Sequence, residues 1–259
     1  MTGTSLAGMV FGGLLVFVRI GGAIMMLPGF TAASVPAMVR IGLTVALTAI
    51  IAPLVAGLLP ALPATPILLA VLIAKEAAIG LTLGWLTRVI VIALPVAGQI
   101  ISYQIGLASV LLPNAEIGAE STLIASALNI GIPAFMLGSG LFIVPLFGLL
   151  ASFHWLPPGI PAGSVAGIDY GSIIHGIVAG VAAEFLLAIQ LAAPFLIVGL
   201  VWQVGLGFMT KAAPQLQIFF TASPLQILGG LILLGVTVVP MIAVWNHAAA
   251  RLLIHGFSP

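Results

Sequence analysis

The stretch GQIISYQIGLASVLLPNAEIGAESTLIAS, residues 98–126, decides how the chain is organised, because polar side chains interrupt an otherwise apolar sequence. Its polar members include Gln99, Ser102, Gln104, Ser109, Asn114, Glu116, Glu120 and Ser121. Lipid tails offer no hydrogen-bond partners, so such groups lie at membrane depth only inside protein or along a watery path. The stretch is interpreted either as the lining or stopper of a pathway or as a surface loop between two short helices.

The composition around this stretch is that of an integral membrane protein. Of 259 residues, 62% are hydrophobic and 4% are charged, whereas soluble domains carry about 25% charged residues. The length allows one compact membrane domain. A net charge of +1 gives no basis for nucleic-acid binding, and the absence of cysteine excludes disulfides, thiolate nucleophiles and cysteine-ligated metals.

Apolar runs long enough to cross a bilayer predict about six long hydrophobic helices. They are expected near residues 6–28, 40–59, 67–95, 123–153, 173–208 and 225–247. The fourth run is interrupted by Pro133, Gly138, Gly140 and Pro145 and is expected to form two half-helices. A second polar interruption is expected at residues 209–224.

The predicted fold class is all-α: a polytopic membrane protein of broken helical hairpins with a central re-entrant segment. We expect a single domain. Its N-terminal helices would occupy residues 1–97, the channel-lining segment residues 98–126, and the C-terminal helices residues 127–259.

Charged side chains inside the apolar runs need partners, because an unpaired charge at membrane depth costs several kcal/mol. Lys75 and Glu76 are neighbours in sequence and point about 100° apart on a helix, so each needs its own partner. Pairing with neighbouring helices or subunits is favoured over a proton relay. Glycines four residues apart, such as Gly80 and Gly84, would let another helix approach closely.

Catalytic motifs are missing from the sequence. It contains no H-E-x-x-H, P-loop, G-x-S-x-G or dinucleotide fingerprint. Asp169 is the only aspartate, which excludes proteolysis by paired aspartates, and the four histidines are far apart and suit membrane interfaces. We therefore predict neither an enzyme nor a cofactor or metal site.

An ordered set of short motifs covers nearly the whole chain. The motifs are Arg19-Ile-Gly-Gly22, Pro28-Gly-Phe30, Val35-Pro36, Val39-Arg40, Lys75-Glu76 with Gly80 and Gly84, Gly98 with Ile101, Gln104 and Gly106, Ala193-Pro194, and Ala213-Pro214-Gln215 with Ile218-Phe219 and Pro224. In this order and spacing the chain resembles the FliR family of flagellar export-gate membrane proteins and their SctT/SpaR-like counterparts in virulence type III secretion.

The resemblance implies a core subunit of the flagellar type III protein export gate. It would assemble with FliP-like and FliQ-like subunits, and with FlhB-like and FlhA-like components, in the lipid of the bacterial inner membrane at the flagellar basal body. Unfolded protein substrates would leave the cytoplasm through this gate. Energy coupling would come from other components.

The resemblance also implies roles for particular residues. A plug would close the channel within residues 106–121, built on Gly106, Leu107, Ser109, Val110, Leu111, Leu112, Pro113, Asn114 and Glu116. Subunit-interface or buried charges would be Arg19, Arg40, Lys75, Glu76 and Glu184. A family loop motif would comprise Lys211, Pro214, Gln215, Ile218, Phe219 and Pro224.

The chain departs from the family pattern at three places. Pro113-Asn114 stands where the family usually has an acidic residue followed by proline, Lys211 replaces arginine, and Gln217 replaces asparagine. Three alternatives stay open: a virulence-system homologue with the same gate role, an assembly scaffold without gating, and a small-solute transporter. A transporter would be expected to show an internal repeat, and none is convincing.

Overall fold

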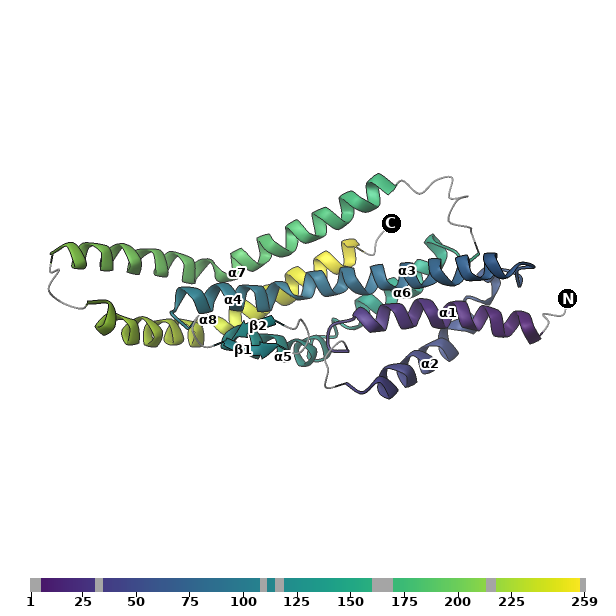
Figure 1. Cartoon of the computed structure of the whole chain (residues 1–259), viewed down its shortest axis with the longest axis horizontal. Coiled ribbons are helices and arrows are strands. Elements are labelled where there is room, and N and C mark those ends of the chain that lie inside the picture. Colours follow the sequence, from purple (N-terminus) through teal and green to yellow (C-terminus); the bar gives the residue numbers. More distant parts are fainter. Residues whose placement is uncertain are drawn as a thin grey trace. The chain divides into compact units, whose positions relative to one another are not determined.

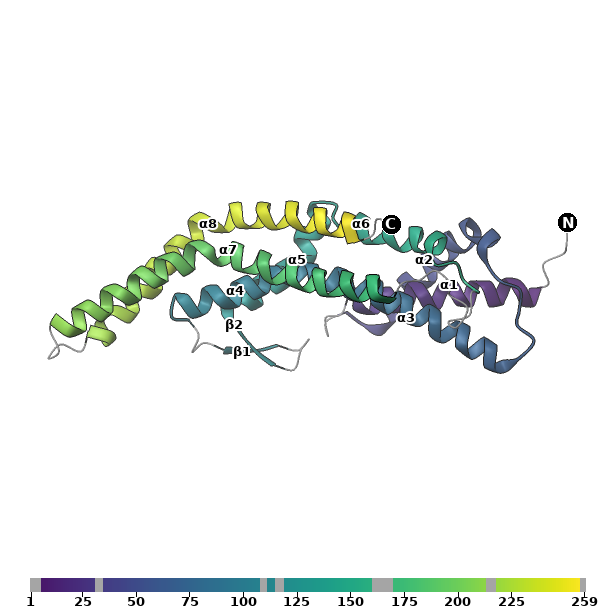
Figure 2. The ribbon, with the colours of Figure 1, turned by 90° about the horizontal axis from the view of Figure 1, so that it is seen from above.

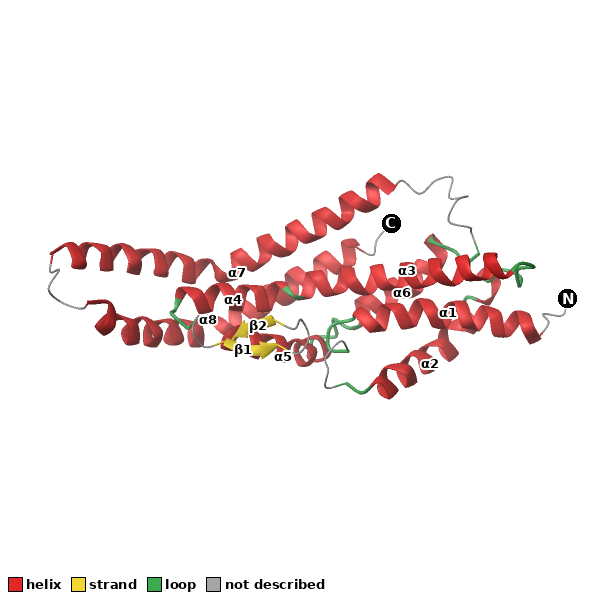
Figure 3. Cartoon of the chain, viewed as in Figure 1, coloured by secondary structure: helices red, strands yellow, loops and turns green. Residues whose placement is uncertain are grey.

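The part of the chain that the structure describes is built almost entirely of helices, with one small strand pair (Figures 1 and 3). The computed structural model describes residues 6–30, 35–107, 111–114, 119–159, 170–212 and 218–256. Its helices are α1 (Leu6–Met26), α2 (Ala37–Leu54), the 3-10 turn η1 (Ala56–Leu58), α3 (Pro66–Val91), α4 (Ala93–Gln104), α5 (Leu123–Gly138), α6 (Ile143–Trp155), α7 (Tyr170–Ala212) and α8 (Ile218–Gly256).

Five stretches of this helical structure are long and apolar enough to cross a membrane, and a sixth is added if a bent pair counts as one span. The bent pair is α5 and α6, which meet at 71° across a short break. This confirms the polytopic all-α class and the two half-helices expected from the proline and glycine pattern. The chain is thus a multi-pass membrane protein.

Two expectations about element boundaries were wrong. α7 continues to Ala212 and α8 begins at Ile218, so the helices extend into the polar interruption expected at residues 209–224. Pro224 lies inside α8, where a membrane helix tolerates proline if other groups satisfy the freed carbonyl. The strands β1 (Leu111–Asn114) and β2 (Ala119–Thr122) were not predicted.

The chain divides into two compact units. Unit 1 comprises Met1–Ile90, Gly140–Gly180 and Ala250–Pro259, and unit 2 comprises Val91–Ser139 and Val181–Ala249. The expectation of a single domain divided in sequence order stays a prediction.

Unit 1 is organised around one face of α1. The buried residues of this helix recur every three or four positions and form an apolar stripe that Arg19 interrupts. Val16 and Ile20 from this stripe share a buried cluster with Ile51 of α2 and Phe153 of α6. Packing against other elements of the unit therefore holds α1 in place.

Unit 2 contains α4, the strand pair, α5 and most of α7 and α8. In Figures 1 and 2 the C-terminal half of α7 runs beside the N-terminal half of α8, and a hydrogen bond joins Trp202 to Gln226 across them. Large apolar side chains cover the outer faces of these helices; Val201 is 68% exposed and Val236 is 72% exposed. Such faces suit contact with lipid or with other membrane helices.

Candidate functional site

The predicted plug segment begins where α4 ends, at a glycine with a left-handed backbone. Gly106 has φ of +82°. Its N–H donates to the Tyr103 carbonyl at 3.4 Å, and the Leu107 N–H donates to the Ser102 carbonyl at 2.9 Å. This pair of bonds is the Schellman arrangement, which satisfies the last carbonyls of a helix and turns the chain away from its axis. Gly106 therefore fixes the point where the segment leaves α4.

The far end of the segment is held by Gln99, which lies on α4 before its last turn. Its Oε1 accepts from the Thr122 backbone N–H at 3.2 Å and from the Thr122 hydroxyl at 3.1 Å. Its Nε2 donates to the Tyr103 hydroxyl at 3.1 Å. One amide side chain thus ties the start of α5 to α4.

Close packing of α4 and α5 supports this tie. A Cβ added at Gly98 would lie 2.9 Å from Leu128 Cδ1 and 3.0 Å from Ala125 Cα. Glycine at this position allows the two helices to approach this closely. Both ends of residues 106–121 therefore rest on one closely packed pair of helices.

Between these ends the backbone forms the antiparallel strand pair β1–β2. Leu111 pairs with Thr122, and Asn114 pairs with Ala119. Pro113 lies opposite Glu120 in this register. The pairing places Leu111, near the start of the segment, beside Thr122 at its end.

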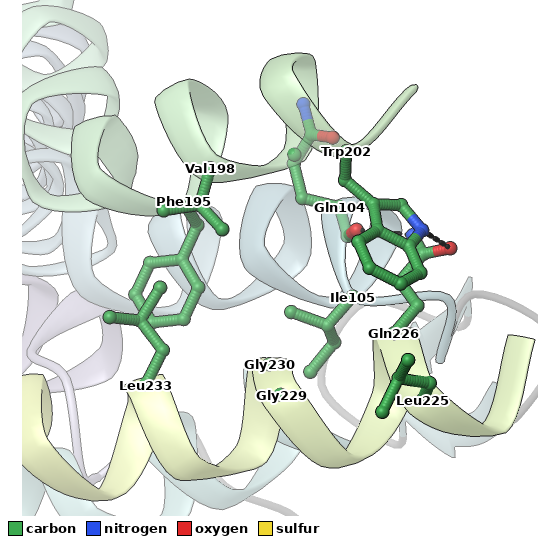
Figure 4. A pocket seen from close by; sticks show the side chains of 11 residues that line it. Gln104, Ile105, Phe195, Val198, Trp202, Leu225, Gln226, Gly229, Gly230 and Leu233 are labelled. Atoms are coloured by element: carbon green, nitrogen blue, oxygen red, sulfur yellow. Dashed lines mark hydrogen bonds between the residues drawn. The ribbon is translucent and has the colours of Figure 1, made fainter. Parts of the chain in front are cut away.

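A third contact holds the end of α4 against α7 and α8 (Figure 4). Gln226 of α8 donates from Nε2 to the Gln104 backbone carbonyl at 2.8 Å. Trp202 of α7 donates from its indole Nε1 to Gln226 Oε1 at 3.1 Å. An apolar cavity of about 80 Å³ adjoins these groups, with Phe195 and Leu233 among its lining residues.

Arg19 and Glu76, two of the predicted buried charges, form an ion pair in the core of unit 1. Arg19 Nε lies 2.6 Å from Glu76 Oε2, and both side chains are 0% exposed. The Arg19 guanidinium also donates to the carbonyls of Ser152 and Leu156 at 3.0 and 2.8 Å and lies over the Phe153 ring, 4.2 Å from its centroid. These contacts satisfy a charge that would otherwise be costly to bury.

Lys75, next to Glu76 in sequence, also has a partner in unit 1. Its Nζ donates to the Pro157 carbonyl at 3.2 Å. Lys75 and Glu76 thus have separate partners, as their helical spacing predicted. The pairing that the structure describes for both lies within the chain, and a role for either at a subunit interface stays a prediction.

The glycine spacing on α3 has the predicted effect. A Cβ on Gly80 would collide with the Arg19 carbonyl, and a Cβ on Gly84 would collide with the Ala23 carbonyl and lie 2.8 Å from Met26 Cβ. The backbones of α1 and α3 therefore touch, and this close approach brings Arg19 within reach of Glu76.

The remaining predicted residues are placed as follows. Arg40 donates to the Val35 carbonyl at 3.2 Å near the start of α2. Glu184 is buried on α7, Lys211 is exposed in its last turn, and Pro224 is exposed on α8. For some predicted residues the structure describes only the backbone, in β1 and in the first turn of α8: Leu111, Leu112, Pro113, Asn114, Ile218 and Phe219. Predicted residues outside the described part of the chain are Ser109, Val110, Glu116, Pro214 and Gln215.

Sequence reasoning missed several residues that hold the site. Three of them, Trp202, Gln226 and Thr122, form hydrogen bonds at the ends of the plug segment. The fourth is Ser152, whose backbone carbonyl accepts from Arg19. An isolated glutamine or tryptophan in an apolar run could have pointed to such a bond, because a buried polar group needs a partner. Nothing in the spacing identifies that partner.

Comparison with known proteins finds relatives that match most of the chain. A family model described as bacterial export proteins, family 1, matches residues 10–252. The chain is 30% identical over 255 residues to flagellar biosynthetic protein FliR of Caulobacter vibrioides, covering 98% of both proteins. It is 29% identical to FliR of Bacillus subtilis, over 85% of this chain and 83% of the relative. It is 26% identical to Yop proteins translocation protein T of Yersinia pestis, over 84% of this chain and 80% of the relative.

Proposed function

The chain belongs to family 1 of the bacterial export proteins, and we propose that it is a core subunit of the flagellar type III protein export gate. The observation that carries this proposal is the 30% identity to a flagellar biosynthetic protein over 98% of both chains. The multi-pass helical fold suits a subunit of a membrane channel.

The flagellar system is preferred over a virulence system because the flagellar relatives are more similar. FliR of Caulobacter vibrioides is 30% identical and the Yersinia pestis protein is 26% identical. A small-solute transporter is not favoured, since the family and the Caulobacter and Yersinia relatives are named for export, flagellar biosynthesis and protein translocation. The proposed role is structural and gating rather than enzymatic.

In this proposal the chain assembles with FliP-like and FliQ-like subunits, and with FlhA-like and FlhB-like components, in the inner membrane at the basal body. The apolar outer faces of α7 and α8 are chemically suited to packing against such helices. Unfolded flagellar proteins would pass through the assembled channel.

Residues 106–121 act as the plug of this channel. Support comes from the way the segment is held. Both of its ends are fixed on the α4–α5 pair by Gly106 and Gln99, and its described part between them is a short strand pair rather than a helix. A stopper needs ends that are held in this way in the closed state, so that the segment returns to the same position each time it closes.

Purification of a tagged copy from its native cells in mild detergent tests the assembly. Mass spectrometry should find FliP-like and FliQ-like proteins in one large complex with the chain. An unrelated tagged multi-span protein from the same membranes is the control. Recovery of a lone monomer or homodimer from cells that express those subunits would contradict the proposal.

A further inference from the structure

The end of α4 packs against two glycine notches, one at Gly199 of α7 and one at Gly230 of α8. A Cβ on Gly199 of α7 would lie 2.6 Å from Gln104 Oε1 and 3.5 Å from Gln104 Cβ. A Cβ on Gly230 of α8 would collide with the Ile105 side chain. Glycine at both positions therefore leaves the space that Gln104 and Ile105 occupy, directly before Gly106.

The orientation of the Gln226 amide at this point is determined by chemistry. An indole N–H can only donate, so the Gln226 atom facing Trp202 must be the oxygen. The amide nitrogen then faces the Gln104 carbonyl, which belongs to the last helical turn, where carbonyls generally lack intrahelical donors. Trp202 thus sets which way the Gln226 amide faces, and the amide nitrogen of Gln226 binds the end of α4.

A small pocket lies beside this bond. The cavity of about 80 Å³ lies between Phe195 and Val198 of α7 and Leu233 of α8 (Figure 4). The contact at the end of α4 therefore combines specific hydrogen bonds and close packing at Gly199 and Gly230 with a small apolar pocket at its side.

We infer that Trp202, Gln226 and the notches at Gly199 and Gly230 form a clamp that positions the end of α4 and so keeps residues 106–121 in the closed state. Opening of the gate requires the Gln104 carbonyl to leave Gln226. This inference rests on the proposed plug function. It adds that the closed state depends on residues of α7 and α8, far from the plug in sequence.

Leakage of ions through the assembled gate tests the clamp. Gln226→Leu keeps the approximate volume and removes both hydrogen bonds, and Trp202→Phe removes the bond that orients Gln226. Gln203→Leu is the matched control, because Gln203 is exposed beside Trp202 on the same helix. Potassium release from cells that contain the complete gate should rise about fivefold or more for Gln226→Leu, the equivalent of one or more lost hydrogen bonds. It should rise less for Trp202→Phe and stay at the wild-type rate for Gln203→Leu.

A reversible cross-link between positions 104 and 199 tests the same clamp and leaves the Trp202 and Gln226 side chains in place. The chain has no cysteine, and the 3.5 Å between the Gly199 Cβ position and Gln104 Cβ lies within the range of disulfides. In the double variant Gln104→Cys/Gly199→Cys, oxidation should stop secretion in proportion to the fraction cross-linked, and dithiothreitol should restore it. Each single cysteine variant is the control for oxidation of partner subunits.

Two outcomes would overturn the clamp: no extra leak from Gln226→Leu in a normally assembled gate, or undiminished secretion by the oxidised double variant. Replacement of residues 108–120 by an equally long Gly-Ser linker separates this failure from failure of the proposed function. If the linker variant leaks and Gln226→Leu does not, the plug function stands and the clamp is wrong. If neither leaks, the plug function itself is wrong.

Discussion

Arg19 and Glu76 are 57 positions apart in sequence and form a fully buried ion pair that joins α1 to α3. The close approach at Gly80 and Gly84 makes the pair possible, and the carbonyls of Ser152 and Leu156 complete the partners of the guanidinium. An internal role therefore accounts for two charges that the family resemblance had implied as interface or buried groups. A charge reversal at Glu76 would disturb the fold of unit 1 before it disturbed any subunit contact.

Replacing either partner of this pair should destabilise the chain strongly. Loss of one member of a buried pair costs about 3–5 kcal/mol, because the other charge stays buried without compensation. Glu76→Leu and Arg19→Met should each lower the Tm of the purified protein in detergent. The double variant should lower the Tm by less than the sum of the two single changes. Strict additivity would contradict the pairing.

Alanine should have opposite effects at two helical glycines. Gly80→Ala places a methyl group against the Arg19 carbonyl, so α1 and α3 must separate and the Tm should fall. Gly42→Ala on α2 meets nothing within 4 Å, and it should stabilise the helix by about 0.5–1 kcal/mol through lower chain entropy. Shifts of the same sign in both variants would be inconsistent with the α1–α3 contact.

The end of α4 should depend on a left-handed residue at position 106. Gly106 has room for a side chain, since its Cβ position lies 3.7 Å from the nearest atom, Ile227 Cγ1. Gly106→Ala should therefore cost about 1–2 kcal/mol through backbone strain alone. Gly106→Asn should cost less, because asparagine enters this region more readily. Hydrogen exchange at the Leu107 amide should be faster in the alanine variant than in the asparagine variant; equal rates would argue against the helix cap.

Gln99 should hold the start of α5 through its acceptor oxygen. Gln99→Leu removes both bonds from Thr122, and Gln99→Glu keeps an acceptor for them while losing the donor to Tyr103. Exchange in a peptide covering residues 119–126 should accelerate in the leucine variant and stay slow in the glutamate variant. If the two variants exchange alike, Gln99 does not hold this end.

Hydropathy and the proline and glycine pattern predicted the membrane spans and the break between α5 and α6, because both depend on local sequence. The sequence also singled out the polar residues of the central stretch as the lining or stopper of a pathway. Several of them serve structural purposes: the Ser102 hydroxyl bonds to the Gly98 carbonyl, and Gln99 ties α4 to α5. A pathway lining at these positions stays a prediction.

The pairings at the site could not be predicted, because they join residues far apart in sequence. Gln226 donates to the Gln104 carbonyl 122 positions away. The reason for glycine at positions 199 and 230 becomes clear only from the contact with Gln104 and Ile105. The strand pair also lacks the usual pattern, since β1 contains Pro113 and little alternation of apolar and polar residues. Tertiary contact rather than local propensity determines these features.

The measurement that tests the central claim most directly is ion leakage through the complete gate when residues 108–120 are replaced by a Gly-Ser linker of equal length. Complex yield is followed in the same cells by purification with the partner subunits. The account predicts a normal yield of complex and a clear rise in potassium release over wild type. A normally assembled complex that leaks no more than wild type and secretes normally would contradict the gate function of this segment.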